Sequence, residues 1–210
     1  MYHFQGIYHE PSHKRLDLQI IVDLIEEGSK VLDIGCGDGD LLALLKKEKK
    51  ITAYGIEILD EKIGNCVSKG LTVFQGNIDE GLCDYGNGCF DYVILSQTLQ
   101  VVMKTEFVIN EILRVGKKAI ISFPNFGFWK CRWDLLITGR SPKTKSLPFE
   151  WYDTPNTRIL TIKDFRAFCE EKNIAIIKEI PLLGTKTQGK VVAMLPNWRA
   201  HYGMFIISKD

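Results

Sequence analysis

Lys30-Val31-Leu32-Asp33-Ile34 is followed directly by Gly35-Cys36-Gly37-Asp38-Gly39-Asp40, and then by the leucine-rich run Leu41-Leu42-Ala43-Leu44-Leu45. A short apolar run containing a carboxylate, then glycines at alternate positions, then a helical pattern predicts a strand, a tight loop and a helix. Glycine lets such a loop take positive φ and lets its backbone approach a bound molecule. The amides at the start of the helix would point at that molecule. We therefore interpret this stretch as a ligand-binding loop.

The residues around these glycines argue against two familiar phosphate-binding loops. A dinucleotide-binding turn reads G-x-G-x-x-G, and counted from Gly35 its third glycine would fall where this chain has Asp40. Asp38 and Asp40 would repel a pyrophosphate, but they are compatible with the cationic sulfonium and amino group of S-adenosylmethionine (SAM). No Gly-Lys-Ser/Thr follows, so the loop is not a P-loop.

A second carboxylate strengthens the nucleoside interpretation. Tyr54-Gly55-Ile56-Glu57 predicts another buried strand, and Glu57 stands 22 positions after Gly35. That spacing suits an acid that accepts hydrogen bonds from ribose hydroxyls. The alternative is a glycine-rich turn that only joins a strand to a helix.

These residues resemble the class I SAM-dependent methyltransferases, and the chain from about Arg15 onward resembles the MetW family of methionine biosynthesis. The glycine motif alone indicates the superfamily, whereas later stretches indicate the family because generic methyltransferases do not share them. The family-level stretches are Tyr92-Val93-Ile94-Leu95-Ser96-Gln97-Thr98-Leu99-Gln100, Ser122-Phe123-Pro124-Asn125-Phe126-Gly127 and Leu147-Pro148-Phe149-Glu150-Trp151-Tyr152-Asp153-Thr154-Pro155-Asn156.

The expected fold is α/β and Rossmann-like. Strands and helices alternate through residue 123, which predicts right-handed βαβ units and a parallel sheet. We expect strands at residues 30–34, 51–57, 71–75, 89–95, 117–123, 174–182 and 202–208, and helices at 14–27, 40–48, 60–68, 104–114, 127–137 and from Thr161, with Asp164 completing a capping box. The last two strands have no predicted helix between them, so we expect an antiparallel edge hairpin. The resemblance implies a seven-stranded, mostly parallel sheet with helices on both faces.

Length and composition predict one domain over residues 14–210, preceded by a flexible arm at 1–13 and carrying an aromatic loop or cap at 124–160.

The net charge is +1, with 27 basic and 26 acidic residues, which gives no electrostatic field to attract nucleic acid. The six cysteines form no C-x-x-C pair, so we expect reduced thiols and no metal site. With no signal peptide and no membrane-spanning run, we expect a cytoplasmic protein.

The resemblance implies which residues hold SAM or S-adenosylhomocysteine. They are Asp33, Gly35, Cys36, Gly37, Glu57, Ile58, Asn77, Ile78, Ser96 and Gln97. Glu57 is expected to take both ribose hydroxyls, and Asn77 with Ile78 to bracket the adenine. The family more often has aspartate at the Asn77 position, so Asn77 and Asp79 both remain candidates for the adenine contact, and an ordinary turn is the alternative.

No catalytic residue is assigned from the sequence. Many small-molecule methyltransferases have Leu-Glu-His after the fourth strand, but this chain has Leu99-Gln100-Val101 and so lacks the ionisable pair. The four histidines, His3, His9, His13 and His201, are expected at the surface.

Residues 123–152 contain eight of the 22 aromatic residues of the chain, which is far above the average density. They could cover the strand ends as a local core, as we expect for Phe123, or form a binding surface with a basic rim of Arg132, Arg140, Lys143 and Lys145. The predicted partner-binding residues are Phe128, Trp129, Trp133, Phe149, Trp151 and Tyr152.

The MetW resemblance implies a regulatory or activating partner of homoserine O-acyltransferase (MetX), with the SAM site sensing the end product of the pathway. The alternative is a SAM-dependent methyltransferase whose aromatic loop encloses a small-molecule acceptor. We favour the regulatory interpretation because a sensor needs no acceptor chemistry. One family position differs, since Thr157-Arg158 stands where MetW chains usually read Ile-His.

Overall fold

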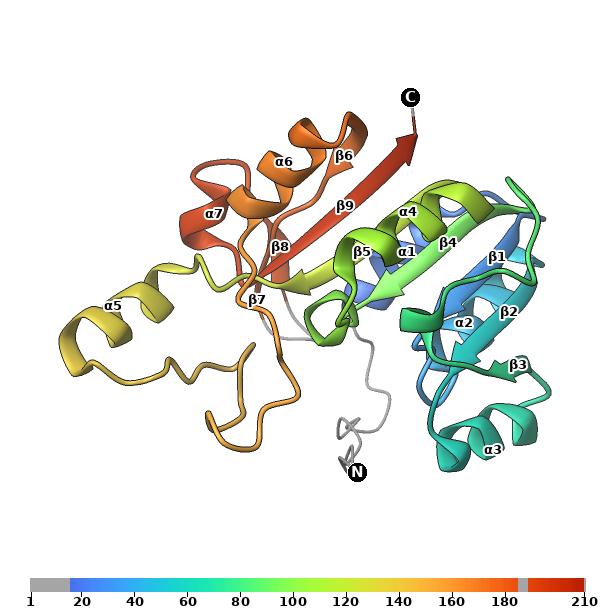
Figure 1. The fold of residues 1–210 in the computed structure, drawn as a ribbon, viewed down its shortest axis with the longest axis horizontal. Coiled ribbons are helices and arrows are strands. Elements are labelled where there is room, and N and C mark those ends of the chain that lie inside the picture. The colour runs from blue at the N-terminus through green and yellow to red at the C-terminus, as the bar shows by residue number, and fades with distance from the viewer. Residues whose placement is uncertain (1–15, 185–188, 210) are drawn as a thin grey trace.

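The computed structural model describes residues 16–184 and 189–209, so the predicted arm at 1–13 lies outside it. Within these ranges one mixed sheet has the order β3-β2-β1-β4-β5-β9-β7-β8, and β6 also pairs with β9 (Figure 1). The strands are β1 (Lys30–Ile34), β2 (Thr52–Glu57), β3 (Thr72–Gln75), β4 (Phe90–Ser96), β5 (Gly116–Pro124), β6 (Ile174–Glu179), β7 (Leu182–Gly184), β8 (Gly189–Val191) and β9 (Tyr202–Lys209). The helices are α1 (Leu16–Leu24), α2 (Asp40–Lys49), α3 (Asp60–Ser68), α4 (Thr105–Val115), α5 (Trp129–Thr138), α6 (Ile162–Glu171) and α7 (Pro196–Arg199), with 3-10 turns η1 (Ile78–Glu80) and η2 (Leu99–Val101).

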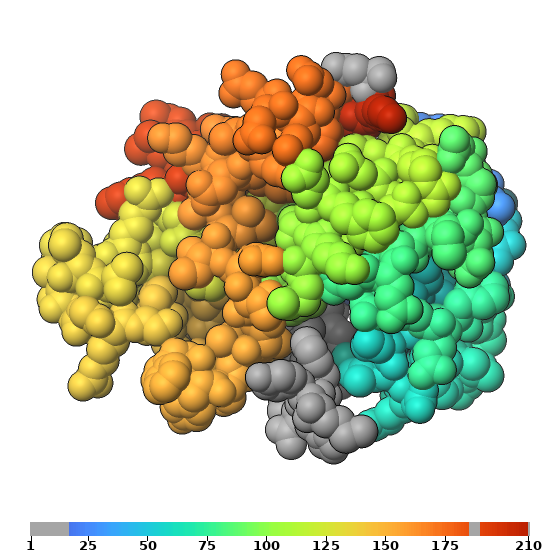
Figure 2. Space-filling view, viewed as in Figure 1, coloured from blue at the N-terminus to red at the C-terminus, as the bar shows by residue number. Residues whose placement is uncertain are grey.

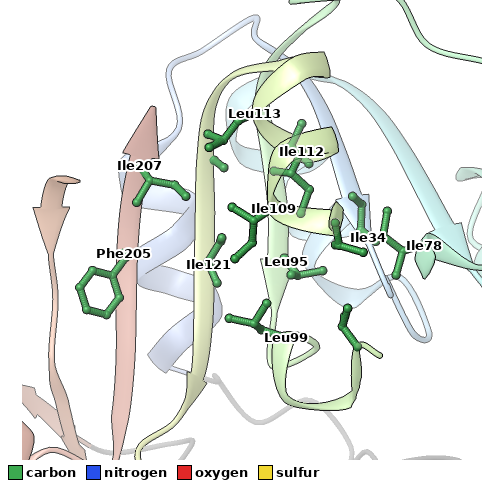
Figure 3. Packing of buried hydrophobic residues seen from close by; sticks show 14 of the residues in the cluster. Ile34, Ile78, Leu95, Leu99, Ile109, Ile112, Leu113, Ile121, Phe205 and Ile207 are labelled. Carbon is green, nitrogen blue, oxygen red and sulfur yellow. The ribbon is translucent and has the colours of Figure 1, made fainter. Parts of the chain in front are cut away.

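The first five strands are parallel, as predicted, and both faces of the sheet are covered by helices. Side chains of β4 alternate between two hydrophobic clusters, with Val93 and Leu95 on the face of α4 and α6 and Ile94 on the face of α1 and α2. Figure 3 shows Ile109 of α4 packed near Ile121 of β5. This burial on both faces explains why the parallel strands read as nearly continuous apolar runs.

The C-terminal part of the sheet differs from the predicted hairpin. β6 and β9 do pair antiparallel, but β9 also pairs along β5, so it lies inside the sheet. The strand expected over 174–182 ends at Glu179, and Pro181, which cannot donate a ladder hydrogen bond, precedes the separate strand β7. β7 pairs with β8, and α7 comes before β9. The sheet therefore has nine strands in the described ranges instead of seven.

The predicted cap of α6 is confirmed. Thr161 accepts a hydrogen bond from the Asp164 amide, and the Asp164 side chain accepts one from the Thr161 amide. Before this helix, residues 124–160 leave the sheet at the carboxyl end of β5. In Figure 1 this segment extends to the left of the sheet, and Figure 2 shows α5, in yellow, projecting from the body of the molecule.

Candidate functional site

The candidate site is built at the edge where β1, β2, β4 and β5 end, because parallel strands place their carboxyl ends together. The glycine loop after β1 follows the left-handed conformations that its sequence predicts, with φ of 69° at Gly35, 57° at Gly37 and 76° at Gly39. The Ile56 carbonyl of β2 accepts hydrogen bonds from the Gly35 amide at 2.8 Å and from the Cys36 amide at 3.1 Å. The loop is thereby fixed against β2.

Two of the glycines are required by their neighbours as well as by their φ angles. A Cβ atom on Gly35 would lie 2.8 Å from Thr98 Oγ1, and one on Gly39 would lie 2.4 Å from Leu71 Cδ1. The loop after β1 therefore packs tightly against the loop after β4 on one side and against α3 and its following turn on the other. Any side chain at Gly35 or Gly39 would push the glycine loop away from these neighbours.

Glu57 at the end of β2 organises the loops around it. Its buried carboxylate accepts hydrogen bonds from the Gly37 amide (2.8 Å) at Oε2, and from the Ile58 (2.9 Å) and Leu59 (3.1 Å) amides at Oε1. A carboxylate has about four acceptor positions, so these three bonds leave one position, on Oε2. Glu57 is thus an anchor of the loop as well as a candidate ligand-binding group.

Asp38 and Asp40 interact with α3 and the turn that follows it. The Asp38 side chain accepts a hydrogen bond from Asn65 Nδ2 at 2.9 Å, and Asp40 pairs with Lys69 Nζ at 2.7 Å. Lys69 also donates to the Asp38 carbonyl. These two carboxylates therefore join the glycine loop to α3, while the buried acids near the site are Asp33 and Glu57.

The loop after β3 separates the roles of Asn77 and Asp79. The carboxylate of Asp79 accepts hydrogen bonds from the Met103 and Lys104 amides, so it is engaged at the start of α4. Asn77 Oδ1 accepts one bond from the Asp79 amide at 3.0 Å and retains a second acceptor position. Ile78 beside it is buried, whereas Ile58 is 52% exposed.

The polar residues at the end of β4 are held by β5. Gln97 has a φ of 53°, an uncommon value for a residue with a side chain, and costs of order 1–3 kcal/mol are typical of such positions. Its amide donates to the Ser122 carbonyl at 2.9 Å, and its Nε2 donates to Ser122 Oγ at 3.2 Å. Ser96 Oγ lies 3.2 Å from the same hydroxyl.

Gln100 is a buried residue that the sequence analysis did not place in the site. Its Nε2 donates to the Gln97 carbonyl at 2.7 Å, while its Oε1 has no hydrogen-bond partner among the described residues. Its own carbonyl accepts bonds from the Thr157 and Arg158 amides. Gln100 therefore ties the end of the 124–160 segment to the carboxyl edge of the sheet. The sequence did contain a signal for Gln100, since it stands where many small-molecule methyltransferases have an ionisable pair.

Two thiols line the back of the glycine loop. Burial raises the pKa of Cys36, and the pKa of Cys66 is also raised, mainly by burial. Cys66 Sγ donates to the Gly37 carbonyl at 3.2 Å. Both thiols are therefore neutral packing groups at pH 7, and Cys36 brings only its backbone and an apolar surface to the site. Across the described ranges, no group of three His, Cys, Asp or Glu side chains could hold a metal ion.

The aromatic residues of the 124–160 segment divide into buried and exposed sets. Phe128 was predicted to bind a partner, but it is only 6% exposed, because it packs with Cys131 and Leu147 and its ring lies 4.3 Å from that of His201. His201 was expected at the surface, and this contact makes it half-buried. The other three histidines lie outside the described residues. Phe123 is fully buried, as expected.

Most of the other predicted partner-binding aromatics are accessible. Phe149 is half-buried, while Trp129, Trp133, Trp151 and Tyr152 are 43%, 56%, 74% and 71% exposed. Of the basic rim, Lys143 is paired with Glu150. No helix in the part of the chain that the structure covers has the length and apolar character to span a membrane.

Solved structures confirm the fold class. A SAM-dependent methyltransferase of Thermotoga maritima, described as a possible histamine N-methyltransferase, has a TM-score of 0.69 with 17% identity, covering 92% of this chain and 88% of that one. The [4+2]-cyclase SpnF has a TM-score of 0.67 with 13% identity, covering 93% and 81%. At these identities the likeness shows the fold alone.

Sequence comparison shows the family. The family model described as methionine biosynthesis protein MetW matches residues 15–207. A protein of Rhodopirellula baltica named bifunctional methionine biosynthesis protein MetXA/MetW is 37% identical over 174 residues, which are 79% of this chain. The chain spans only 28% of that relative's length. The match along nearly the whole described sequence, on a methyltransferase fold, establishes that this chain belongs to the MetW family of methionine biosynthesis proteins.

Proposed function

We propose that this chain is a SAM- or S-adenosylhomocysteine-binding regulatory partner of homoserine O-acyltransferase (MetX). The observation that carries the proposal is the Rhodopirellula baltica relative, whose name joins MetXA and MetW in one polypeptide. Two activities joined in one chain are held at a high effective concentration, as partners in a complex would be. The binding unit is the domain expected at 14–210, and six unpaired cysteines suit the reducing cytoplasm.

The residues of the carboxyl edge fit the proposed ligand. The left-handed loop at Gly35 and Gly37 lets a methionine moiety approach the backbone. Glu57 retains one acceptor position, which suits a single strong hydrogen bond to ribose better than the two first expected. Asn77 is the better adenine candidate, because the Asp79 carboxylate already accepts hydrogen bonds from the Met103 and Lys104 amides.

The remaining predicted cofactor-binding residues contribute to the same proposed site. Asp33 is the next-to-last residue of β1, and Ser96 ends β4 with Gln97 directly after it. Ile58 and Ile78 supply apolar surface for a purine. SAM, when bound, carries a methyl group on a sulfonium that can be displaced in line. The residues described above bind and orient such a ligand, while Gln100 and Val101 stand where many small-molecule methyltransferases carry an acid–base pair.

A methyltransferase is the second candidate, favoured by the fold shared with the Thermotoga maritima enzyme. Methyl transfer requires chiefly that two reactants be positioned, so a missing base does not exclude it. The distinguishing experiment is to copurify the chain with the acyltransferase and to assay acylation with and without it over a range of SAM concentrations. Association together with a change in acylation rate supports regulation. SAM turnover with an acceptor and no association supports the methyltransferase.

A further inference from the structure

We infer that α5 and residues 191–198 form one continuous apolar docking surface for the acyltransferase. Residues 191–198 run from the end of β8 into α7. The inference deepens the proposed function and rests on it. This α5–α7 surface comprises Trp129, Trp133, Leu136, Met194, Leu195 and Trp198, of which the last three lie outside the predicted aromatic segment. Figure 2 shows α5 and the red C-terminal elements on the same side of the molecule.

The helix α5 presents its apolar stripe outward. Trp129, Trp133, Leu136 and Ile137 recur at the spacing of one helical face, and they are 43%, 56%, 76% and 63% exposed. Cys131 is the one residue of this ten-residue helix that is buried. Such a short helix is marginal by itself, so its stability normally comes from packing of an apolar face. Here that face is turned away from the protein's own core.

The second half of the surface is joined to α5 by direct contacts. The Arg132 guanidinium of α5 lies over the Trp198 ring of α7, 5.3 Å from its centroid. Fully buried Asn125 holds the two elements together, because its Nδ2 donates to the Asn197 and Ala200 carbonyls and its Oδ1 accepts from the Gly127 amide. A Cβ on Gly127 would lie 2.6 Å from Asn197 Oδ1, so the approach is close.

Residues 194 and 195 complete the surface with two strongly exposed apolar side chains. Met194 is 71% and Leu195 is 67% exposed, and Leu195 takes a left-handed φ of 50° immediately before α7. A branched residue in that conformation is strained, and aspartate or glycine would be more usual there. A flexible methionine and a leucine a few positions before exposed Trp198 have the composition of a protein-binding surface.

The charges beside α5 indicate the chemistry of the occupant. Exposed Lys130, Arg132 and Arg140 flank the stripe, and Asp134 is the one acid of the helix. Two copies of this chain would bring like charges together at the rim, which disfavours self-association. A partner with an apolar centre and an acidic rim fits. The fused MetXA/MetW relative identifies the acyltransferase as the protein that is held next to this domain.

The test uses one charge-introducing variant in each half of the surface. Leu136→Glu tests α5 and Met194→Glu tests the 191–198 segment, because neither side chain has a role in the protein's own core. Ile177→Glu is the matched control, since Ile177 is an apolar side chain that is 52% exposed and belongs to β6, a strand that is not part of this surface. Association with purified acyltransferase is measured by surface plasmon resonance, SAM affinity by calorimetry and oligomeric state by light scattering.

Each of the two surface variants should weaken association at least about tenfold, as expected for central interface positions. Ile177→Glu should bind like the unmodified chain, and all three variants should keep their SAM affinity within about twofold. If Met194→Glu binds normally while Leu136→Glu does not, the two halves are not one surface. If the chain is a dimer that Leu136→Glu dissociates, the occupant is a second copy. Normal association of both variants overturns the surface but leaves the proposed function standing, whereas no association of the unmodified chain overturns both.

Discussion

Gly39 and Gly28 provide a matched pair for measuring how tightly the ligand loop is packed. Both have a φ near 77°, but a Cβ on Gly39 would meet Leu71 and Cys66, whereas one on Gly28 would meet nothing within 4 Å. Gly28→Ala should therefore cost about 1 kcal/mol of unfolding free energy from backbone strain alone. Gly39→Ala should cost about 1–3 kcal/mol more from overpacking. Urea unfolding of both variants measures the difference, and equal losses would contradict the described packing.

Replacing Glu57 should weaken SAM binding, because Glu57 both holds the glycine loop in place and is proposed to bind the ribose. Glu57→Ala removes a charged acceptor that serves three amides and, in the proposed complex, one ribose hydroxyl. Hydrogen bonds to charged groups contribute roughly 1.5–3 kcal/mol, so SAM affinity should fall about tenfold or more. Calorimetry on a variant whose circular dichroism shows it to be folded tests this. Unchanged affinity would exclude Glu57 from the site, and tighter binding of NADH than of SAM would exclude the ligand itself.

The features of the glycine loop that the sequence predicted correctly are local backbone conformations. Gly35 and Gly37 were recognised because positive φ is a backbone property that glycine alone satisfies cheaply. Phe128 was wrongly placed on the surface because its burial depends on His201, 73 positions later in the chain. Gln100 was missed for the same reason, since only the fold brings Thr157 to its carbonyl.

At the scale of elements, Arg114 at the end of α4 fastens the loop that leads into β4. It pairs with Glu111 at 2.7 Å and donates to the Leu82 and Tyr85 carbonyls. The hydrogen bond from Arg114 lowers the pKa of Glu111, with a smaller contribution from the Leu82 amide. A carboxyl whose pKa is lower in the folded state stabilises the fold above its ordinary pKa, and this contribution is lost as the pH falls.

Glu111→Gln should therefore reduce the free energy of unfolding at pH 7 by about 1 kcal/mol. It should also make stability less dependent on pH below about 5, because the titrating group, whose pKa is lower in the folded state than in the unfolded chain, is gone. Chemical unfolding at several pH values compares the variant with the unmodified chain. Parallel pH profiles would show that the pair does not carry the expected linkage.

The elements whose sequence carries a clear local signal were predictable, and those that depend on long-range pairing were not. Parallel strands such as β4 are apolar on both faces, and α6 begins with a local capping box, so both can be read from neighbouring residues. The division of the 174–182 run into β6 and β7 depends on where β9 inserts, which is a long-range pairing. Pro181 is the one local signal for the break, and the pairing of the two pieces with β9 cannot be read from neighbouring residues.

For the whole molecule, the regulatory account predicts the absence of methyl transfer. Incubation with SAM and homoserine, homocysteine or their acyl esters should yield S-adenosylhomocysteine no faster than with Glu57→Ala. The reason is that a sensor has to bind SAM but does not have to position a methyl acceptor, which agrees with Gln100 and Val101 standing where many small-molecule methyltransferases have an acid–base pair. Chromatographic measurement of S-adenosylhomocysteine tests this, and sustained turnover with any of these acceptors would return the protein to the methyltransferase class.

The most direct test of the account is the rate of homoserine acylation measured as SAM is titrated, with the acyltransferase alone and with this chain added in equal amount. The account predicts that adding the chain changes the rate and that SAM modulates this change. With Glu57→Ala, about tenfold more SAM or greater should be needed for the same modulation. An acylation rate that is the same with and without the chain at every SAM concentration would contradict the account.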